Sequence, residues 1–104
     1  MKKDPASLIK AALPEIEALM ANAYKEAEPL KPDHPLAQEG LRNGHEIGLD
    51  YLEHDEAGVA FEHLIYMLIE PPLIISNHCF QLIVSAGKAL GFNPEVWHHV
   101  QHEI

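Results

Sequence analysis

Proline and capping residues divide this chain into short helical segments, and this division restricts the fold more than any other feature of the sequence. The clearest segment runs from Glu56 to Ile69, where apolar residues recur at the spacing of one helix face. Glu70 and the pair Pro71-Pro72 end it, because proline cannot continue a helix and moves the preceding residue out of the helical region. The predicted stripe consists of Ala57, Ala60, Phe61, Leu64, Ile65 and Leu68.

Capping signals predict two further helices in the second half of the chain. Ser76 is a favourable N-cap and Gly91 a favourable C-terminal stop, so we expect a helix from about Asn77 to Leu90. Asn93-Pro94 is an N-cap followed by a proline at the first helical position. It predicts a short helix that runs toward the C-terminus.

The first half begins with a helix that Asp4-Pro5 opens in the same way. Its apolar stripe extends from Leu8 to Ala23. Pro14 lies inside this stripe, which predicts either a kink or two short helices.

The segment from Glu28 to Pro35 holds three prolines and is predicted to be a connector. A further helix is expected from Pro35 to about Glu53. The turn signal Asn43-Gly44 lies within it, so the helix is either continuous there or restarts near His45.

No segment alternates with the period of two that a half-buried strand requires, and no internal repeat is present. The sequence therefore predicts an all-α fold. We expect a compact antiparallel bundle of four main helices with a short C-terminal helix, forming one domain over residues 1–104.

Charge is distributed unevenly. The formal net charge is −9, and the stretch from Asn43 to Gly87 contains seven acidic residues but no lysine or arginine. Phosphate contacts require clustered basic residues, so binding to nucleic acid or to an anionic membrane is not expected. Two interpretations of the acidic stretch remain: an ordinary acidic, solvated surface, or a surface that binds a cationic protein partner.

Helical spacing selects the candidate binding residues. Glu46, Asp50 and Glu53 are separated by four and three positions, which places like charges on one face of a helix, where they repel. His54 adds a titratable group whose pKa a neighbouring carboxylate would raise. Glu62, His63 and Tyr66 form a second group near these acids, and this group is either a boundary between core and solvent or a contact patch. The predicted partner-binding residues are Glu46, Asp50, Glu53, Asp55, Glu56, Glu62 and Tyr66.

Catalytic and metal motifs are incomplete. The sequence contains no P-loop, no Gly-x-Gly-x-x-Gly, no Cys-x-x-Cys and no recognisable triad, so we expect no enzymatic activity and no cofactor. If the last segment is helical, His98 and His102 share one face in a geometry that can chelate zinc or nickel. A third ligand is not identified, and we expect these histidines to form the solvent-exposed side of that helix rather than a metal site.

The single cysteine, Cys79, lies in an apolar run and is predicted to be a buried small hydrophobic residue. The first residues lack the uninterrupted apolar region of a signal peptide, and the most apolar stretch, Leu64 to Ile69, is too short to span a bilayer. We therefore expect a cytoplasmic protein.

The second half of the chain, about Gly44 to Phe92, resembles the small bacterial immunity proteins of the MafI-like and contact-dependent-inhibition families. The similarity lies in Tyr51-Leu52-x-x-x-Glu56, then Gly58-x-Ala60-x-Glu62-x-Leu64, then the acidic Glu70 that closes the helix. The stretch Ser85-Ala86-Gly87-Lys88-Ala89-Leu90-Gly91 also resembles a helix end of that family.

The resemblance implies a small helical protein that binds and neutralises one cognate toxin domain, often a nuclease. A nuclease must be basic to hold nucleic acid, so an acidic inhibitor can occupy that surface. Partner-binding residues in such families diverge with the toxin, and none is transferred here. The alternatives are a small histidine-rich metal- or ligand-binding helical domain and a non-catalytic accessory subunit.

Overall fold

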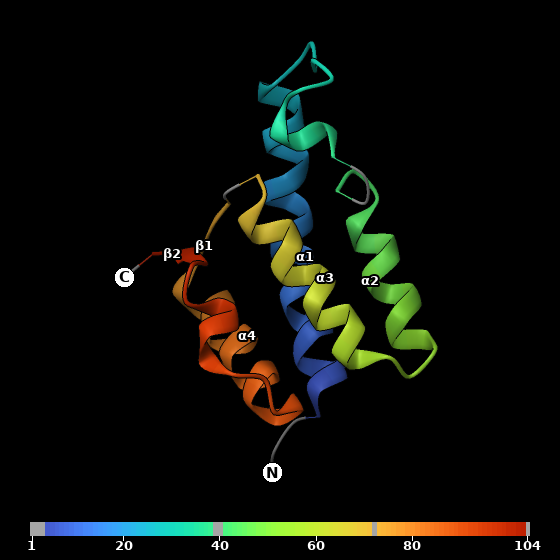
Figure 1. Ribbon diagram of the computed structural model, residues 1–104, viewed down its shortest axis with the longest axis vertical. Coiled ribbons are helices and arrows are strands. Elements are labelled where there is room, and N and C mark those ends of the chain that lie inside the picture. Colours follow the sequence, from blue (N-terminus) through green and yellow to red (C-terminus); the bar gives the residue numbers. More distant parts are fainter. Residues whose placement is uncertain (1–3, 39–40, 72, 104) are drawn as a thin grey trace.

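The computed structural model describes residues 4–38, 41–71 and 73–103. This part of the chain forms a small helical bundle, and the predicted all-α class is confirmed (Figure 1). Four α-helices are accompanied by two 3-10 turns and a two-stranded parallel sheet. The elements are α1 (Pro5–Glu26), η1 (Pro35–Ala37), α2 (Gly44–Glu53), α3 (Ala57–Ile69), β1 (Ile74–Ile75), α4 (Asn77–Leu90), η2 (Pro94–Trp97) and β2 (Gln101–His102).

Helix α1 is the centre of the bundle. In Figure 1 it runs behind α3, with α2 on one side and α4 on the other. It packs antiparallel to α2, because Gly48 lies against Leu13 and His45 against Glu17. Burial of apolar side chains from all four helices is the main stabilising contribution. No helix of the described residues combines the length and apolar character needed to cross a bilayer.

Helix α1 is a single continuous helix, so the alternative of two short helices is wrong. Pro14 lies inside it and cannot donate the usual backbone hydrogen bond. Leu13 and Ile16 on either side of the proline are buried in the same core. One continuous buried stripe therefore holds both halves together in one helix.

Helix α4 has the predicted bounds, and its start is fixed by α1. The Ser76 hydroxyl accepts a hydrogen bond from the Cys79 backbone N–H at 3.1 Å. Glu15 of α1 accepts two hydrogen bonds from Ser76, one from the hydroxyl at 2.6 Å and one from the backbone N–H at 2.7 Å. Gly91 ends the helix in the left-handed conformation at φ 83°.

Cys79 is buried as predicted, at the contact between α4 and α1. Its Sγ lies 3.8 Å from the Ala12 carbonyl oxygen. Burial raises the pKa of this thiol to about 12, and the nearby Glu15 carboxylate acts in the same direction.

Iodoacetamide at pH 8 is therefore expected to leave Cys79 of the folded protein unmodified, because only about one thiol in ten thousand is then ionised. The same reagent should label the unfolded chain in urea completely. Mass spectrometry measures both. Labelling of the native protein as fast as that of the unfolded chain would contradict a buried, protonated thiol.

The helix predicted from Pro35 to Glu53 does not form as one unit. The chain makes a single turn, η1, and Gln38 is already extended. Residues 39 and 40 lie outside the described part, as does Pro72 of the predicted stop after α3. Helix α2 begins at Gly44, so of the two alternatives the restart near His45 is the one observed.

Gly44 lies at this restart, where α2 approaches the Met67 side chain of α3 closely. A Cβ atom on Gly44 would lie 2.6 Å from Sδ and Cε of Met67. Further along the pair, the rings of Tyr51 and His63 are 6.5 Å apart. Helices α2 and α3 therefore form an antiparallel hairpin, with the turn at residues 54–56.

The predicted C-terminal helix is only the single turn η2. The expectation of no strands is wrong, because Gln101 and His102 form the short strand β2. Trp97 is buried, and the chain then leaves the helical conformation. Strand β2 pairs in parallel with β1, and the Glu103 N–H donates to the Ile75 carbonyl oxygen at 2.8 Å. His98 and His102 consequently do not share a helix face.

Candidate functional site

The outer face of α2 carries the acidic residues that the spacing predicted. Glu46, Asp50 and Glu53 are all exposed, while Gly44 and Gly48 on the opposite side are buried. Because the chain has no lysine or arginine between residues 43 and 87, neighbouring positions on α2 and α3 supply no permanent positive charge. We call Glu46, Asp50, Glu53, Asp55 and Glu56 the acidic face.

The turn that completes the acidic face is rigidly defined by backbone hydrogen bonds. The Asp55 N–H donates to the Leu52 carbonyl at 3.2 Å and the Glu56 N–H to the Tyr51 carbonyl at 2.8 Å. This pair of bonds is a Schellman motif, which requires a left-handed residue after the helix. Asp55 occupies that position at φ 59°, although glycine is the usual residue there.

Replacing Asp55 with glycine is expected to stabilise the protein by about 0.5–1 kcal/mol, because a left-handed conformation strains a residue with a Cβ atom and a negative charge is unfavourable at a helix C-terminus. Chemical denaturation measures the difference. Asp55→Ala is the matched control, since it removes the same charge but keeps the Cβ atom. Equal stability of the glycine and alanine variants would contradict a conformational cost at this position.

His54 is a histidine that contacts the acidic face through Asp50. Its Nδ1 lies 2.8 Å from the Asp50 carbonyl oxygen and 3.6 Å from Asp50 Oδ1. The Asp50 carbonyl and then its carboxylate are the largest causes that raise the pKa of His54, and Glu56 and Glu53 add to them. The increase in pKa agrees with the expectation from sequence.

A raised pKa in the folded state means that protonated His54 favours folding. This contribution is fully present below the ordinary value of 6.5 and is lost as the pH rises through the raised pKa. His54→Gln is therefore expected to lower the melting temperature more at pH 5.5 than at pH 8.5. Thermal denaturation of both proteins at the two pH values measures the difference. A larger effect at pH 8.5 would contradict the assignment.

Glu62 and Tyr66, the other two predicted binding residues, lie on α3, whereas the acidic face lies on α2 and the turn that follows it. Glu62 is exposed, and Tyr66 is half-buried with its hydroxyl donating to Gln38 Oε1 at 3.3 Å. Tyr66 is about 15 Å along α3 from Glu56, the last residue of the turn, at 1.5 Å per residue. Since the hairpin is antiparallel, Tyr66 lies toward the Glu46 end of α2 and away from Asp55.

The exposed side of α3 also carries apolar residues that the sequence analysis did not select. Val59 is 43% exposed and Ile69 37%. With Glu62 and Tyr66 they follow spacings of three, four and three, so they share one helix face. Val59 and Ile69 do not belong to the predicted buried stripe of α3. An apolar residue outside that stripe is the signal in the sequence that could have identified them as exposed.

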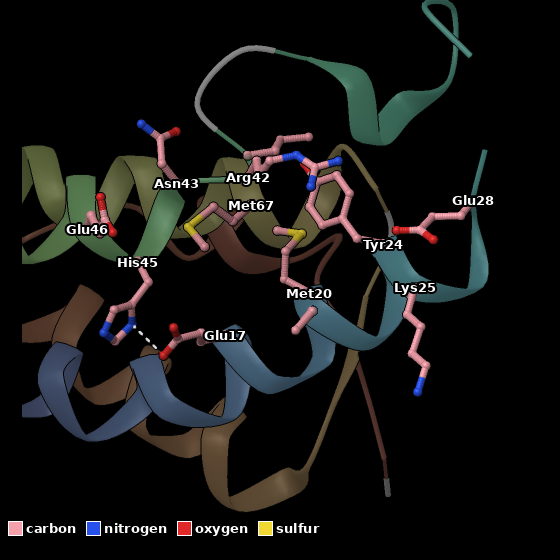
Figure 2. A pocket seen from close by; sticks show the side chains of 12 residues that line it. Glu17, Met20, Tyr24, Lys25, Glu28, Arg42, Asn43, His45, Glu46 and Met67 are labelled. Atoms are coloured by element: carbon pink, nitrogen blue, oxygen red, sulfur yellow. Dashed lines mark ion pairs between the residues drawn. The ribbon is translucent and has the colours of Figure 1, made fainter. Parts of the chain in front are cut away.

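A pocket of about 550 Å³ opens between the second half of α1, the segment that leads into α2, and Met67 of α3. Figure 2 shows Met20 and Met67 in its centre, with His45 and Glu17 at one end and Tyr24 at the other. Sequence patterns do not indicate this pocket, because its lining residues come from three segments that only the tertiary fold brings together.

The histidines near the C-terminus are dispersed. The rings of His98 and His99 are 6.5 Å apart, and His102 stacks on Phe80 at 3.7 Å. Within residues 4–38, 41–71 and 73–103, no group of three histidine, cysteine or carboxylate side chains is arranged to hold a metal ion.

Comparison of the chain with protein-family models, with curated proteins and with solved structures gives no match.

Proposed function

We propose that this protein is an immunity-type inhibitor that binds a basic toxin domain, with a nuclease as the expected toxin class, through the acidic face. The observation that carries the proposal is the exposure of Glu46, Asp50 and Glu53 on one side of α2, in a stretch without lysine or arginine. The resemblance of residues 44–92 to immunity proteins supports the same function from a different direction.

The acidic face has an energetic cost that the fold does not explain. Like charges three and four positions apart on a helix repel each other by a few tenths of a kcal/mol per pair. His54 offsets part of this repulsion near Asp50, but only when it is protonated. A basic partner would remove the repulsion on binding and would be attracted from a distance.

The exposed side of α3 supplies the apolar contacts that stable protein interfaces need. Val59 and Ile69 expose apolar surface, and Tyr66 offers a partly exposed ring. Tyrosine and aliphatic side chains beside charges are typical of binding surfaces. A histidine-based metal site, the main alternative, has less support because His98 and His102 do not share a helix face.

Growth rescue tests this function directly. A basic nuclease toxin domain, sought first in the gene that neighbours this one, is expressed in a bacterial host alone, with the wild-type protein, or with the double variant Asp50→Lys/Glu53→Lys. We expect wild-type protein to restore growth and the double variant to restore it much less. Failure of the wild-type protein to protect against that domain, or to bind it after purification, would refute the proposal.

The matched control is the double variant Glu26→Lys/Glu103→Lys. Both positions are exposed, and the net charge changes by the same amount. Glu26 ends α1, and Glu103 follows β2, which lies on the opposite side of the molecule from α2 in Figure 1. Full protection by this control would show that the position of the acids matters and not only the net charge.

A further inference from the structure

We infer that the pocket between α1 and the start of α2 receives one long cationic side chain, lysine or arginine, from a basic protein partner. This inference rests on the proposed function for the identity of the partner, but it can be tested without the partner. The pocket volume of about 550 Å³ lies within the range of about 300–1,000 Å³ typical of small-ligand sites.

The centre of the pocket suits the alkyl stem of such a side chain. Met20 and Met67 lie side by side there (Figure 2), and Leu41 also lines it. Lysine and arginine pack their methylene groups along apolar surfaces while the charged group remains in a polar environment. Methionine is flexible and polarisable, so the two thioethers can adjust to an inserted chain.

One end of the pocket offers a carboxylate for the charged group. Glu17 is 58% exposed, and its Oε2 lies 3.4 Å from His45 Nδ1. That nitrogen is buried and has no hydrogen-bond partner among the residues described, so the contact has ion-pair distance without hydrogen-bond geometry. Glu17 therefore retains the capacity to accept hydrogen bonds from a guanidinium or ammonium group.

The cations that line the pocket lie away from this end. Arg42 is stacked 4.3 Å above the Tyr24 ring, and Figure 2 shows the Lys25 side chain pointing away from the two methionines. The start of α2 carries the positive end of the helix dipole, but Glu46 in its first turn opposes that field. An incoming cation at this end thus meets the Glu17 carboxylate, with the His45 imidazole beside it.

Glu46 connects the pocket to the acidic face, because it belongs to both. A basic partner on α2 would therefore reach the pocket with residues at the border of the same interface. Side chains that fill a pocket within an interface contribute a large share of binding energy. The pocket would accordingly select a partner with a protruding lysine or arginine.

Methionine methyl NMR of the free protein tests the inference with three probes of similar length: butylguanidinium, pentanoate and pentanol. We expect butylguanidinium to produce saturable shifts of the Met20 and Met67 methyl signals in the millimolar range. Glu17→Gln should weaken this binding several-fold, whereas Glu26→Gln, an exposed carboxylate outside the pocket, should leave it unchanged.

Tighter binding of pentanoate or pentanol than of butylguanidinium, or equal binding by the Glu17→Gln variant, would overturn the cation assignment. Because no toxin is present, this result is independent of growth rescue. Protection from the toxin combined with an unresponsive pocket would refute this inference alone. Saturable cation binding without protection would refute the proposed function while retaining a cation-binding pocket.

Discussion

Replacing Gly87 with alanine is expected to lower the free energy of unfolding by about 3 kcal/mol or more, since overpacking a filled core forces backbone shifts. The added Cβ atom would lie 2.2 Å from Cζ3 of Trp97 and 2.9 Å from Cζ of Phe61. Both aromatic side chains are buried, with their ring centroids 6.3 Å apart in an edge-to-face arrangement. Neither ring can move away without opening the core.

The consequences of Gly87→Ala should extend to the C-terminal segment. Trp97 ends η2, and the strand β2 follows a few residues later. A displaced Trp97 would therefore also weaken the pairing of β2 with β1. Amide hydrogen exchange should show reduced protection at Glu103, whose N–H donates to the Ile75 carbonyl.

Gly58→Ala is the matched control for this prediction. No atom lies within 4 Å of a Cβ on Gly58, which is in the first turn of α3. Alanine there should raise the stability by about 0.5–1 kcal/mol, because glycine loses more conformational entropy on folding. Urea denaturation monitored by Trp97 fluorescence compares the two variants. Similar unfolding midpoints for both would contradict the close contact at Gly87.

The helices with strong local signals were predicted well. Helix α4 has the bounds that Ser76 and Gly91 indicate, because each residue satisfies backbone groups at its own end of the helix. Helix α3 differs from the prediction by one residue at its start. In both helices the apolar stripe is buried, and α4 also has a capping residue at each end, so tertiary contacts reinforce the local preference.

The errors occur where a distant contact decides the local conformation. Helix α2 starts at Gly44, which packs against Met67 of α3, a residue far away in sequence. The C-terminal segment becomes a strand because Ile74 and Ile75 offer a pairing partner. Helical spacing and capping signals contain no information on such contacts.

The candidate site was predicted in part for the same reason. Helical spacing correctly placed Glu46, Asp50 and Glu53 on one exposed face. It gave no information on the left-handed conformation of Asp55, which belongs to the turn. The pocket requires the fold itself, since its residues come from three separate segments.

Reversing the charges at Asp50 and Glu53 to lysine is expected to slow association with a basic partner about tenfold at low salt, because long-range attraction controls the encounter rate. Folding should be unaffected or slightly stabilised, by a few tenths of a kcal/mol, since the reversal relieves like-charge repulsion on α2. Surface plasmon resonance with the immobilised toxin domain measures the rates. Glu26→Lys/Glu103→Lys should change the association rate far less.

Salt and pH should reproduce the effect of the reversal without any substitution. The electrostatic screening length shortens to about 3 Å at 1 M salt, so the association rate of the wild-type protein should fall toward that of the double variant. Protonation of all eight histidines moves the formal charge from −9 to −1, and lower pH should slow association in the same direction. His54 titrates within the acidic face, so His54→Gln should reduce part of this pH dependence.

The combination of these measurements separates a binding surface from a merely solvated one. A binding surface requires that salt, low pH and charge reversal at Asp50 and Glu53 slow association together, and that charge reversal at Glu26 and Glu103, outside the acidic face, does not. Dissociation should also accelerate if Asp50 or Glu53 is covered by the partner, because a buried, unpaired charge is costly. If the association rate is indifferent to salt and to both reversals, the acidic face only interacts with water, and the partner binds elsewhere.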